Sequence, residues 1–127
     1  MSSIESLLDF FNFQGREEAL ADSLAYGERK KLSVALALSC KPELLLLDEP
    51  AAGLNETETA EMADVLGKIR NQGITQILVD HDMKFVMGLC DRVICLNFGN
   101  KIAEGTPEEI QKNEQVIRVY LGEEHAR

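Results

Sequence analysis

The chain has 127 residues, of which 45% are hydrophobic and 28% charged, so it is long enough for one globular domain with a hydrophobic core. It has no apolar stretch near the roughly 20 residues that a membrane span requires, and its start lacks the basic and apolar segments of a signal peptide. The net charge of -9 argues against a nucleic-acid partner, because an acidic surface repels phosphates.

The residues before Pro42 predict helices and no strand. A capping box of Ser2 and Glu5, with an apolar stripe behind it, begins the first helix, and Gln14-Gly15 breaks the helical pattern after it. The third helix should end before Pro42, because proline disfavours helical backbone in the preceding residue. We expect helices at residues 3–11, 16–24 and 28–39. One face of the third helix carries Leu32, Ala35, Leu36 and Ser39.

Two apolar runs predict strands. Four consecutive leucines at 44–47 predict a strand buried on both faces, and the β-branched run at 74–79 predicts a second buried strand. Between them, Asn55 is a good N-cap for a helix that runs to about Arg70 and ends at Gly73.

The last third of the chain predicts a short helix, a hairpin and further helices. The helix is expected at 82–89, and the hairpin strands at 92–96 and 101–104. Thr106 and Pro107 begin another helix as N-cap and first helical residue, and helices continue to about Leu121. The alternation of strands and helices predicts an α/β fold with a mostly parallel sheet.

Two carboxylates, Asp48 and Glu49, directly follow the first predicted strand. In an open parallel sheet, ligands bind beyond the carboxyl ends of the strands. A carboxylate there can hold Mg²⁺ through water, and its neighbour can polarise an attacking water in phosphoryl transfer. The alternative is a strand that ends in two solvated acids before Pro50 begins a turn.

His81 follows the second predicted strand, and it should emerge at the same sheet edge as Asp48 if the two strands are parallel. A histidine there could bind a terminal phosphate and hold a water. One alternative is a surface histidine that caps the next helix. The other is a metal cluster with Asp80 and Asp82, although adjacent strand residues point apart, which argues against a three-ligand site.

Five residues open the third predicted helix: Leu24, Ala25, Tyr26, Gly27 and Glu28. A glycine there leaves backbone N–H groups free, and the positive end of the helix dipole favours an anion. The segment therefore predicts an anion site. The alternative is an ordinary helix start with a permissive glycine.

In their order and spacing, these segments resemble the motifs of the ATP-binding-cassette (ABC) ATPases. Residues 24–28 resemble the family signature, usually LSGGQ, and residues 44–50 resemble the Walker B segment. Residues 51–55 (Ala-Ala-Gly-Leu-Asn) resemble the D-loop, and His81 resembles the switch histidine. The likeness runs from about Ser23 to Gly122. It is greatest to the ATPase subunits of branched-chain amino-acid importers, on Tyr-Gly in the signature, His-Asp-Met, and Ala-Glu-Gly-Thr-Pro near the end.

This resemblance implies roles for the residues after the two strands. Asp48 would organise Mg²⁺ through water, and Glu49 would act as general base or polarise the water. His81 would contact the γ-phosphate. Gly53 and Asn55, in the D-loop, would act with the signature across a head-to-tail dimer.

The resemblance also implies that the signature covers the ATP held by the opposite subunit. This chain departs from the family motif at two positions. Ala25 replaces the serine hydroxyl that would reach a phosphate, and Glu28 replaces glutamine. Gly27 keeps the backbone donor.

The phosphate loop is absent from the sequence, because GxxxxGK[ST] occurs nowhere in it. That loop supplies most of the donors for the β- and γ-phosphates. The chain thus resembles the C-terminal half of an ABC ATPase. We expect an α/β fold: a partial P-loop NTPase sheet with flanking helices that lacks the phosphate-loop strand. Residues 1–41 would be a remnant of the helical signature subdomain, and residues 42–127 the C-terminal part of the ATPase core.

The missing strand would lie beside residues 74–79 in the family sheet. Its absence leaves an unpaired apolar strand edge, which invites pairing with another chain. We expect the gap to be closed by rearranged pairing or by formation of a homo-oligomer.

The expected function is that of an ATP-binding and hydrolysing importer subunit, present as a fragment that is inactive alone and binds ATP and Mg²⁺ weakly or not at all. The alternative is a non-catalytic interaction module that supplies signature and D-loop to a partner ATPase in trans. A truncated reading frame without a role of its own is a third reading.

The expected partners are a second copy or a second ABC ATPase subunit, and transmembrane permease subunits, but no nucleic acid. The expected location is cytoplasmic, at the inner face of the cell membrane. Three cysteines without CxxC spacing fit that reduced compartment, with the thiols as core filler.

Overall fold

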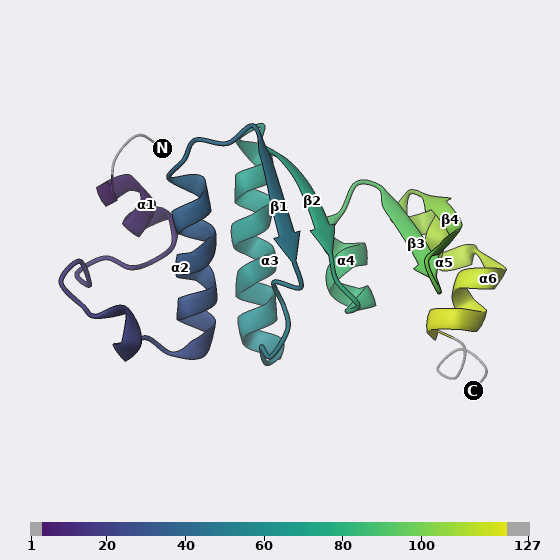
Figure 1. Ribbon diagram of the computed structural model, residues 1–127, viewed down its shortest axis with the longest axis horizontal. Helices are drawn as coiled ribbons and strands as arrows, with labels where there is room; N and C mark the ends of the chain where they lie inside the picture. The colour runs from purple at the N-terminus through teal and green to yellow at the C-terminus, as the bar shows by residue number, and fades with distance from the viewer. Residues whose placement is uncertain (1–3, 122–127) are drawn as a thin grey trace. The chain divides into compact units, whose positions relative to one another are not determined.

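The computed structural model describes residues 4–121 and divides the chain into two compact units, Met1–Asp80 and His81–Arg127 (Figure 1). No described helix is long and apolar enough to cross a membrane. The expected division near residue 42 into a helical subdomain and a core stays a prediction. The capping box at Ser2 lies outside the described residues.

The first unit combines helices with a two-stranded parallel sheet. Its elements are α1 (Ile4–Phe10), the 3-10 turn η1 (Ala21–Ser23), α2 (Tyr26–Leu38), β1 (Leu44–Asp48), α3 (Glu56–Asn71) and β2 (Thr75–Val79). Leu44 pairs with Thr75 and Asp48 pairs with Val79, so the two strands end at the same edge. Asn55 caps α3 as predicted, since its Oδ1 accepts a hydrogen bond from the Glu58 amide at 2.8 Å.

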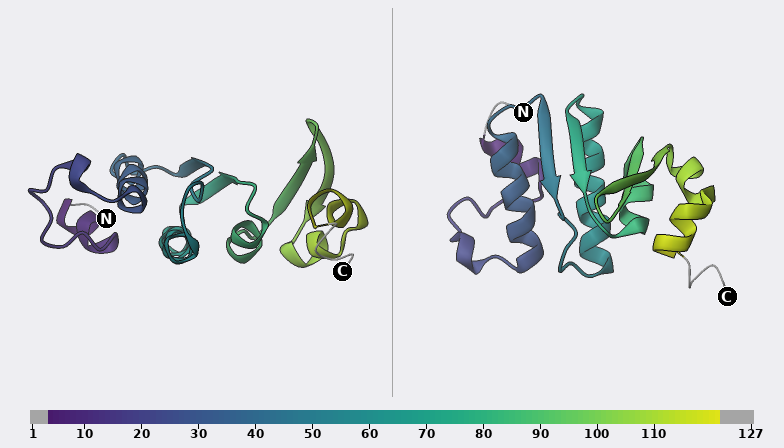
Figure 2. Two further views of the ribbon diagram at one scale, coloured as in Figure 1. Left: turned by 90° about the horizontal axis from the view of Figure 1, so that it is seen from below. Right: turned by 45° about the vertical axis from the view of Figure 1, so that its right-hand side comes forward.

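Helix α3 covers one face of this sheet (Figure 2). Apolar side chains spaced three or four residues apart along α3 form the buried stripe that this contact requires. The buried side chains of α3 are Met62, Val65, Leu66 and Ile69. Leu45 and Leu47 of β1 are buried as well.

The opposite face of the sheet is open, so the prediction of strands buried on both faces is wrong. Alternate residues of a strand point to opposite faces, and only one face is covered by described residues. The exposed fractions on the open face are 48% for Leu44, 69% for Leu46, 54% for Ile77 and 59% for Val79. A run of leucines indicates a fully buried strand only when helices cover both faces.

The buried stripe of α2 differs from the predicted one. Val34, Ala35 and Leu38 are buried, whereas Leu36 and Ser39 are exposed. Gly27, the second residue of the helix, lies directly against the Glu58 carboxylate of α3. This close approach fixes which side of α2 faces the rest of the unit.

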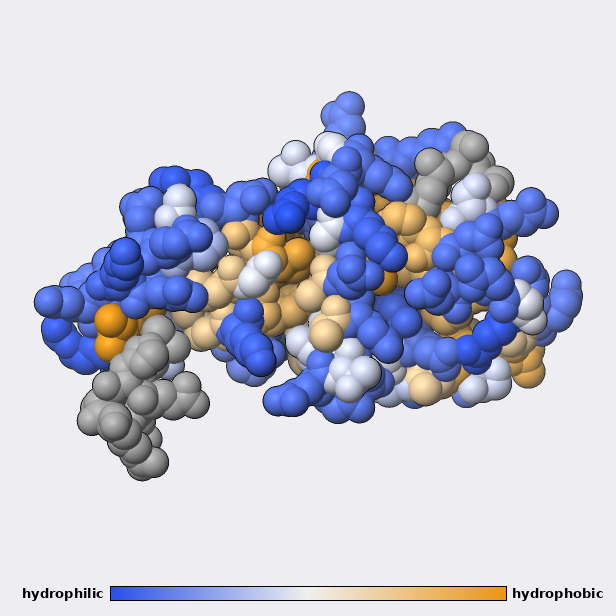
Figure 3. All heavy atoms as spheres, turned by 180° about the vertical axis from the view of Figure 1, so that it is seen from behind, coloured by the Kyte–Doolittle hydropathy of each residue, from blue (hydrophilic) through white to orange (hydrophobic). Residues whose placement is uncertain are grey.

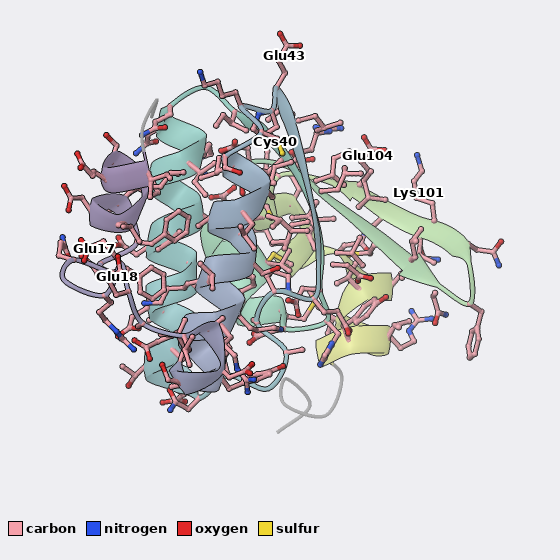
Figure 4. The ribbon with its side chains drawn as sticks, turned by 60° about the vertical axis from the view of Figure 1, so that its left-hand side comes forward. Glu17, Glu18, Cys40, Glu43, Lys101 and Glu104 are labelled. Atoms are coloured by element: carbon pink, nitrogen blue, oxygen red, sulfur yellow. The ribbon has the colours of Figure 1, made fainter. Side chains whose placement is uncertain are left out.

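The helix predicted at residues 16–24 is wrong apart from the single turn η1. All residues from Glu17 to Ser23 are exposed, and Glu17 and Glu18 point outward (Figure 4). A short helix is marginal in water unless it packs an apolar face, and this segment has no such contact.

The second unit contains α4 (Met83–Leu89), the antiparallel hairpin of β3 (Val93–Asn97) and β4 (Asn100–Gly105), α5 (Pro107–Lys112), α6 (Glu114–Val116) and the π-helical turn η2 (Ile117–Leu121). The hairpin and the capping box at Thr106 are confirmed. Val93 and Cys95 form its core with Ile110 and Val116. Glu104 of β4 pairs with Lys101 at 3.0 Å, and both lie on the hairpin in Figure 4.

The three cysteines have different surroundings. Cys95 is buried, and burial raises the pKa of its thiol, which suits an inert core residue. Cys90 is half-buried, whereas Cys40 is exposed after the end of α2 (Figure 4). The expectation that all three thiols fill the core is therefore wrong for Cys40.

Among the described residues, each sheet has only two strands, β1–β2 and β3–β4. A rearranged strand pairing that closes the gap beside β2 therefore does not occur among the described residues. The second edge of β2 thus remains without a strand partner in the described part of the chain. Hydrophilic side chains predominate on the side shown in Figure 3, with apolar side chains exposed between them.

Candidate nucleotide site

The loop after β1 begins with the two predicted carboxylates. Asp48 and Glu49 are both exposed, and the Glu49 amide donates to the carbonyl of Val79 at 2.7 Å. Glu49 has a φ of 50°, a left-handed backbone that costs a residue with a Cβ roughly 1–2 kcal/mol. Asp80 holds the loop from the β2 side, since its Oδ2 accepts from the Ala51 amide at 3.3 Å.

The D-loop residues continue from this turn into α3. Ala52 donates its amide to the Glu49 carbonyl at 3.1 Å, which closes the turn. Gly53 has a φ of 77°, a conformation that favours glycine. Asn55 uses its side-chain oxygen to cap α3, and its own amide donates to Glu58 Oε1 at 3.1 Å. Asn55 therefore has a structural role in the described chain, and its role toward a nucleotide stays a prediction.

The signature residues form the start of α2. Leu24 is half-buried and Ala25 is the N-cap. Tyr26 and Gly27 lie in the first helical turn, with Gly27 buried against Glu58.

Glu28 is directed back to its own helix. Its Oε1 accepts from the Ala25 amide at 3.0 Å, and its other oxygen pairs with Arg16. The hydrogen bond from Arg16 is the larger cause of the lowered pKa of Glu28, and the hydrogen bond from the Ala25 amide lowers it further. The family glutamine is thus replaced here by a helix cap whose charge is balanced within the chain.

Glu28 predicts a pH dependence of stability. Its folded-state pKa lies below the ordinary 4.5, so its contribution is full above that value and is lost as the pH falls through the lowered folded pKa. Glu28 and Arg16 are about one-third exposed, so we expect Glu28→Gln to cost only about 0.5 kcal/mol at pH 7 and nothing once the pH lies below the lowered folded pKa. Urea unfolding at both pH values measures this, with Glu18→Gln as the exposed control. An equal loss at both pH values would contradict it.

The structure brings the signature and the D-loop together within the first unit. Lys30 Nζ donates to the carbonyls of Glu49 and Ala52, at 3.0 Å each, and the Tyr26 hydroxyl donates to the carbonyl of Ala52 at 3.4 Å. Sequence reasoning missed Lys30. The available signal was its position four residues after Tyr26, which places the two side chains on one face of α2.

A groove of about 550 Å³ lies between α2 and β1. Arg29 and Lys30 line it from α2, and Asp48 lines it at the end of β1. Asp48 makes no side-chain hydrogen bond or ion pair within the described residues. Its carboxylate is a hard oxygen donor at an exposed strand end, and it fits Mg²⁺, which usually keeps several waters and is bound by one or two protein carboxylates.

His81 is exposed and begins the second unit. The helix-capping role that we considered for it belongs to Asp82, whose Oδ1 accepts from the Phe85 amide at 3.1 Å. Among residues 4–121, no three His, Cys, Asp or Glu side chains are grouped so that they could hold a metal ion. The phosphate-contacting role of His81 stays a prediction.

Comparison with known proteins adds to this geometry. A family model described as "ABC transporter" matches residues 2–52, and one for the branched-chain amino acid ATP-binding cassette transporter matches residues 100–126. The high-affinity branched-chain amino acid transport ATP-binding protein LivG of Salmonella typhimurium is 51% identical over 104 residues, or 81% of this chain. The chain belongs to the ABC ATPase family.

Solved structures of ABC ATPases share the fold of this ABC chain. The ATP-binding cassette MJ1267 in its ADP conformation has a TM-score of 0.83 at 24% identity, covering 93% of this chain and 48% of that one. The cbiO1 protein of Clostridium perfringens, part of the cbiONQ transporter complex, has a TM-score of 0.80 at 30% identity, covering 96% of this chain and 49% of that one. The partial P-loop fold is therefore confirmed. The ABC chain spans 41% of the length of LivG and about half of each solved relative.

Proposed function

We propose that this ABC chain supplies the Walker B, D-loop and signature residues of an ATP-hydrolysing importer subunit for branched-chain amino acids. The observation that supports this most is the exposed pair Asp48–Glu49 at the end of β1, in a loop that is hydrogen-bonded to the signature helix. The identity to LivG supports the substrate class.

In the proposed reaction, Asp48 would hold Mg²⁺ through water, and the chemistry that Mg²⁺ would supply there is neutralisation of phosphate charge. Glu49 accepts a proton from the attacking water or polarises it. His81 hydrogen-bonds the γ-phosphate. Leu24, Ala25, Tyr26, Gly27 and Glu28, with Gly53 and Asn55, face the nucleotide of an opposite subunit.

The phosphate loop must come from a segment outside this sequence, since the 127 residues contain no GxxxxGK[ST]. We therefore propose that the chain alone binds Mg²⁺ and ATP weakly or not at all. The proposed partners are a second copy or another ABC ATPase subunit, and permease subunits at the cytoplasmic face of the membrane.

The test supplies the missing loop. This chain is mixed with a separately produced phosphate-loop segment of an ABC ATPase, and complex formation and ATP turnover are measured. We expect Mg²⁺-dependent hydrolysis by the complex and none by either piece alone. A stable complex that does not hydrolyse ATP would contradict the proposed function.

A second candidate function is a non-catalytic module that acts on an intact ABC ATPase. The open apolar face of β1 and β2 favours it, because exposed apolar surface of this kind marks interaction sites. Mixing the chain with a complete ABC ATPase should then change the turnover of that enzyme in the absence of any phosphate-loop segment.

A further inference from the structure

One ammonium group joins the signature helix to the loop that carries Glu49. Lys30 Nζ lies 3.0 Å from each of the carbonyl oxygens of Glu49 and Ala52. It also lies 5.7 Å from the centre of the Tyr26 ring, within cation–π range. Hydrogen bonds with a charged donor are stronger than neutral ones, so Lys30 links α2 to the loop more strongly than the neutral Tyr26 hydroxyl does.

The backbone at Glu49 needs such support. Its left-handed φ of 50° is unfavourable for a residue with a Cβ, and such conformations persist where the surroundings hold them. The Glu49 carbonyl accepts from the Ala52 amide at 3.1 Å and from Lys30 at 3.0 Å. These two donors fix the peptide group that follows Glu49.

Tyr26 meets the same loop at Gly53. A Cβ built on Gly53 would lie 2.9 Å from Tyr26 Cε1 and 3.3 Å from its hydroxyl oxygen. Both the left-handed φ of 77° and the aromatic ring therefore require glycine at this position. Gly15 has a similar φ of 78° but nothing within 4 Å of such a Cβ. Replacing Gly15 with alanine therefore measures the cost of the left-handed backbone alone.

We propose that Lys30 and Tyr26 clamp the Glu49–Gly53 loop onto α2, which makes Lys30 a positioning residue for Glu49. The clamp joins the signature residues of α2 to the D-loop, so that the two segments move together as one rigid body. Its consequence for catalysis rests on the proposed function, whereas the clamp itself is a property of this chain.

Amide hydrogen exchange of the chain, followed by NMR without nucleotide, tests the clamp. With Lys30→Met, we expect exchange at the Ala52 and Leu54 amides to accelerate about tenfold while the β1 amides keep their rates. Lys30→Arg should restore slow exchange, because it keeps a charged donor. Lys68→Met is the control, since Lys68 pairs with Asp64 on the exposed side of α3. Unchanged loop exchange, or a uniform rise throughout the first unit, would overturn the clamp.

A double-mutant cycle tests the Tyr26 contact independently. Gly53→Ala should destabilise the chain more than Gly15→Ala does, and Tyr26→Ala should remove the excess. We expect a coupling of about fivefold in the unfolding equilibrium constant. Equal effects of Gly53→Ala with and without Tyr26 would overturn the contact.

Turnover of the complex with the phosphate-loop segment distinguishes failure of the clamp from failure of the proposed function. Lys30→Met should lower kcat about tenfold, leave the KM for ATP within about twofold, and be rescued by Lys30→Arg. If Glu49→Gln abolishes turnover but Lys30→Met does not reduce it, the positioning role is wrong. If neither variant changes turnover, the proposed function is wrong, and the exchange result still decides whether the clamp exists.

Discussion

Replacing Glu49 with glutamine is expected to lower ATP turnover about 10²–10⁴-fold in the complex of this chain with a phosphate-loop segment, with Mg-ATP affinity within about twofold. Glutamine keeps the shape of the side chain, so the backbone contacts of Glu49 to Val79 and Lys30 remain. It removes the charge that accepts or attracts a proton of the attacking water. Steady-state turnover and equilibrium nucleotide binding, measured on the same complex, separate the two effects.

The matched control is Glu43→Gln. Glu43 is an exposed carboxylate just before β1, at the opposite end of the strand from Asp48 (Figure 4). The Glu43→Gln variant changes the net charge by the same amount as Glu49→Gln does, and it should leave ATP turnover unchanged. Loss of turnover in both variants would show a general charge effect, and full turnover of Glu49→Gln would remove Glu49 from the reaction.

Replacing Leu66 with alanine is expected to destabilise the first unit by about 2–5 kcal/mol, because the side chain is fully buried and leaves a cavity. Leu46→Ala deletes the same atoms from a side chain that is 69% exposed, so it should cost less than about 1 kcal/mol. Urea unfolding, followed by circular dichroism at low protein concentration, gives both values.

The same pair of variants reports on the open face of the sheet. If copies of the chain associate through that face, the cost of Leu46→Ala should rise with protein concentration while that of Leu66→Ala stays constant. If Leu46→Ala and Leu66→Ala cost the same free energy of unfolding at every protein concentration, the one-sided burial of β1 would be contradicted.

Local signals in the sequence were sufficient where neighbours along the chain determine the structure. The caps at Asn55 and Thr106 use partners three residues away, and both are confirmed. The β3–β4 hairpin likewise follows from the turn residues Asn97-Phe98-Gly99-Asn100 between two predicted strands. These elements need no information about distant parts of the fold.

Prediction failed where distant contacts decide. The leucine run at 44–47 indicated burial on both faces, but the face that is covered depends on the packing of α3, which the run itself does not encode. The contact of Lys30 with the loop joins residues 19 and 22 positions apart, and no motif marks it. The ion pair of Glu28 with Arg16 likewise depends on a preceding loop, and no motif marks it.

The central claim is that this ABC chain carries the metal, water and signature residues of a nucleotide site whose phosphate loop lies outside its sequence. Calorimetric titration of the chain with Mg-ATP, alone and with a phosphate-loop segment, tests it most directly. We predict no binding tighter than about 1 mM for the chain alone, because the principal phosphate donors are absent, and binding near 1 μM for the complex. Micromolar affinity of the chain alone would contradict the claim.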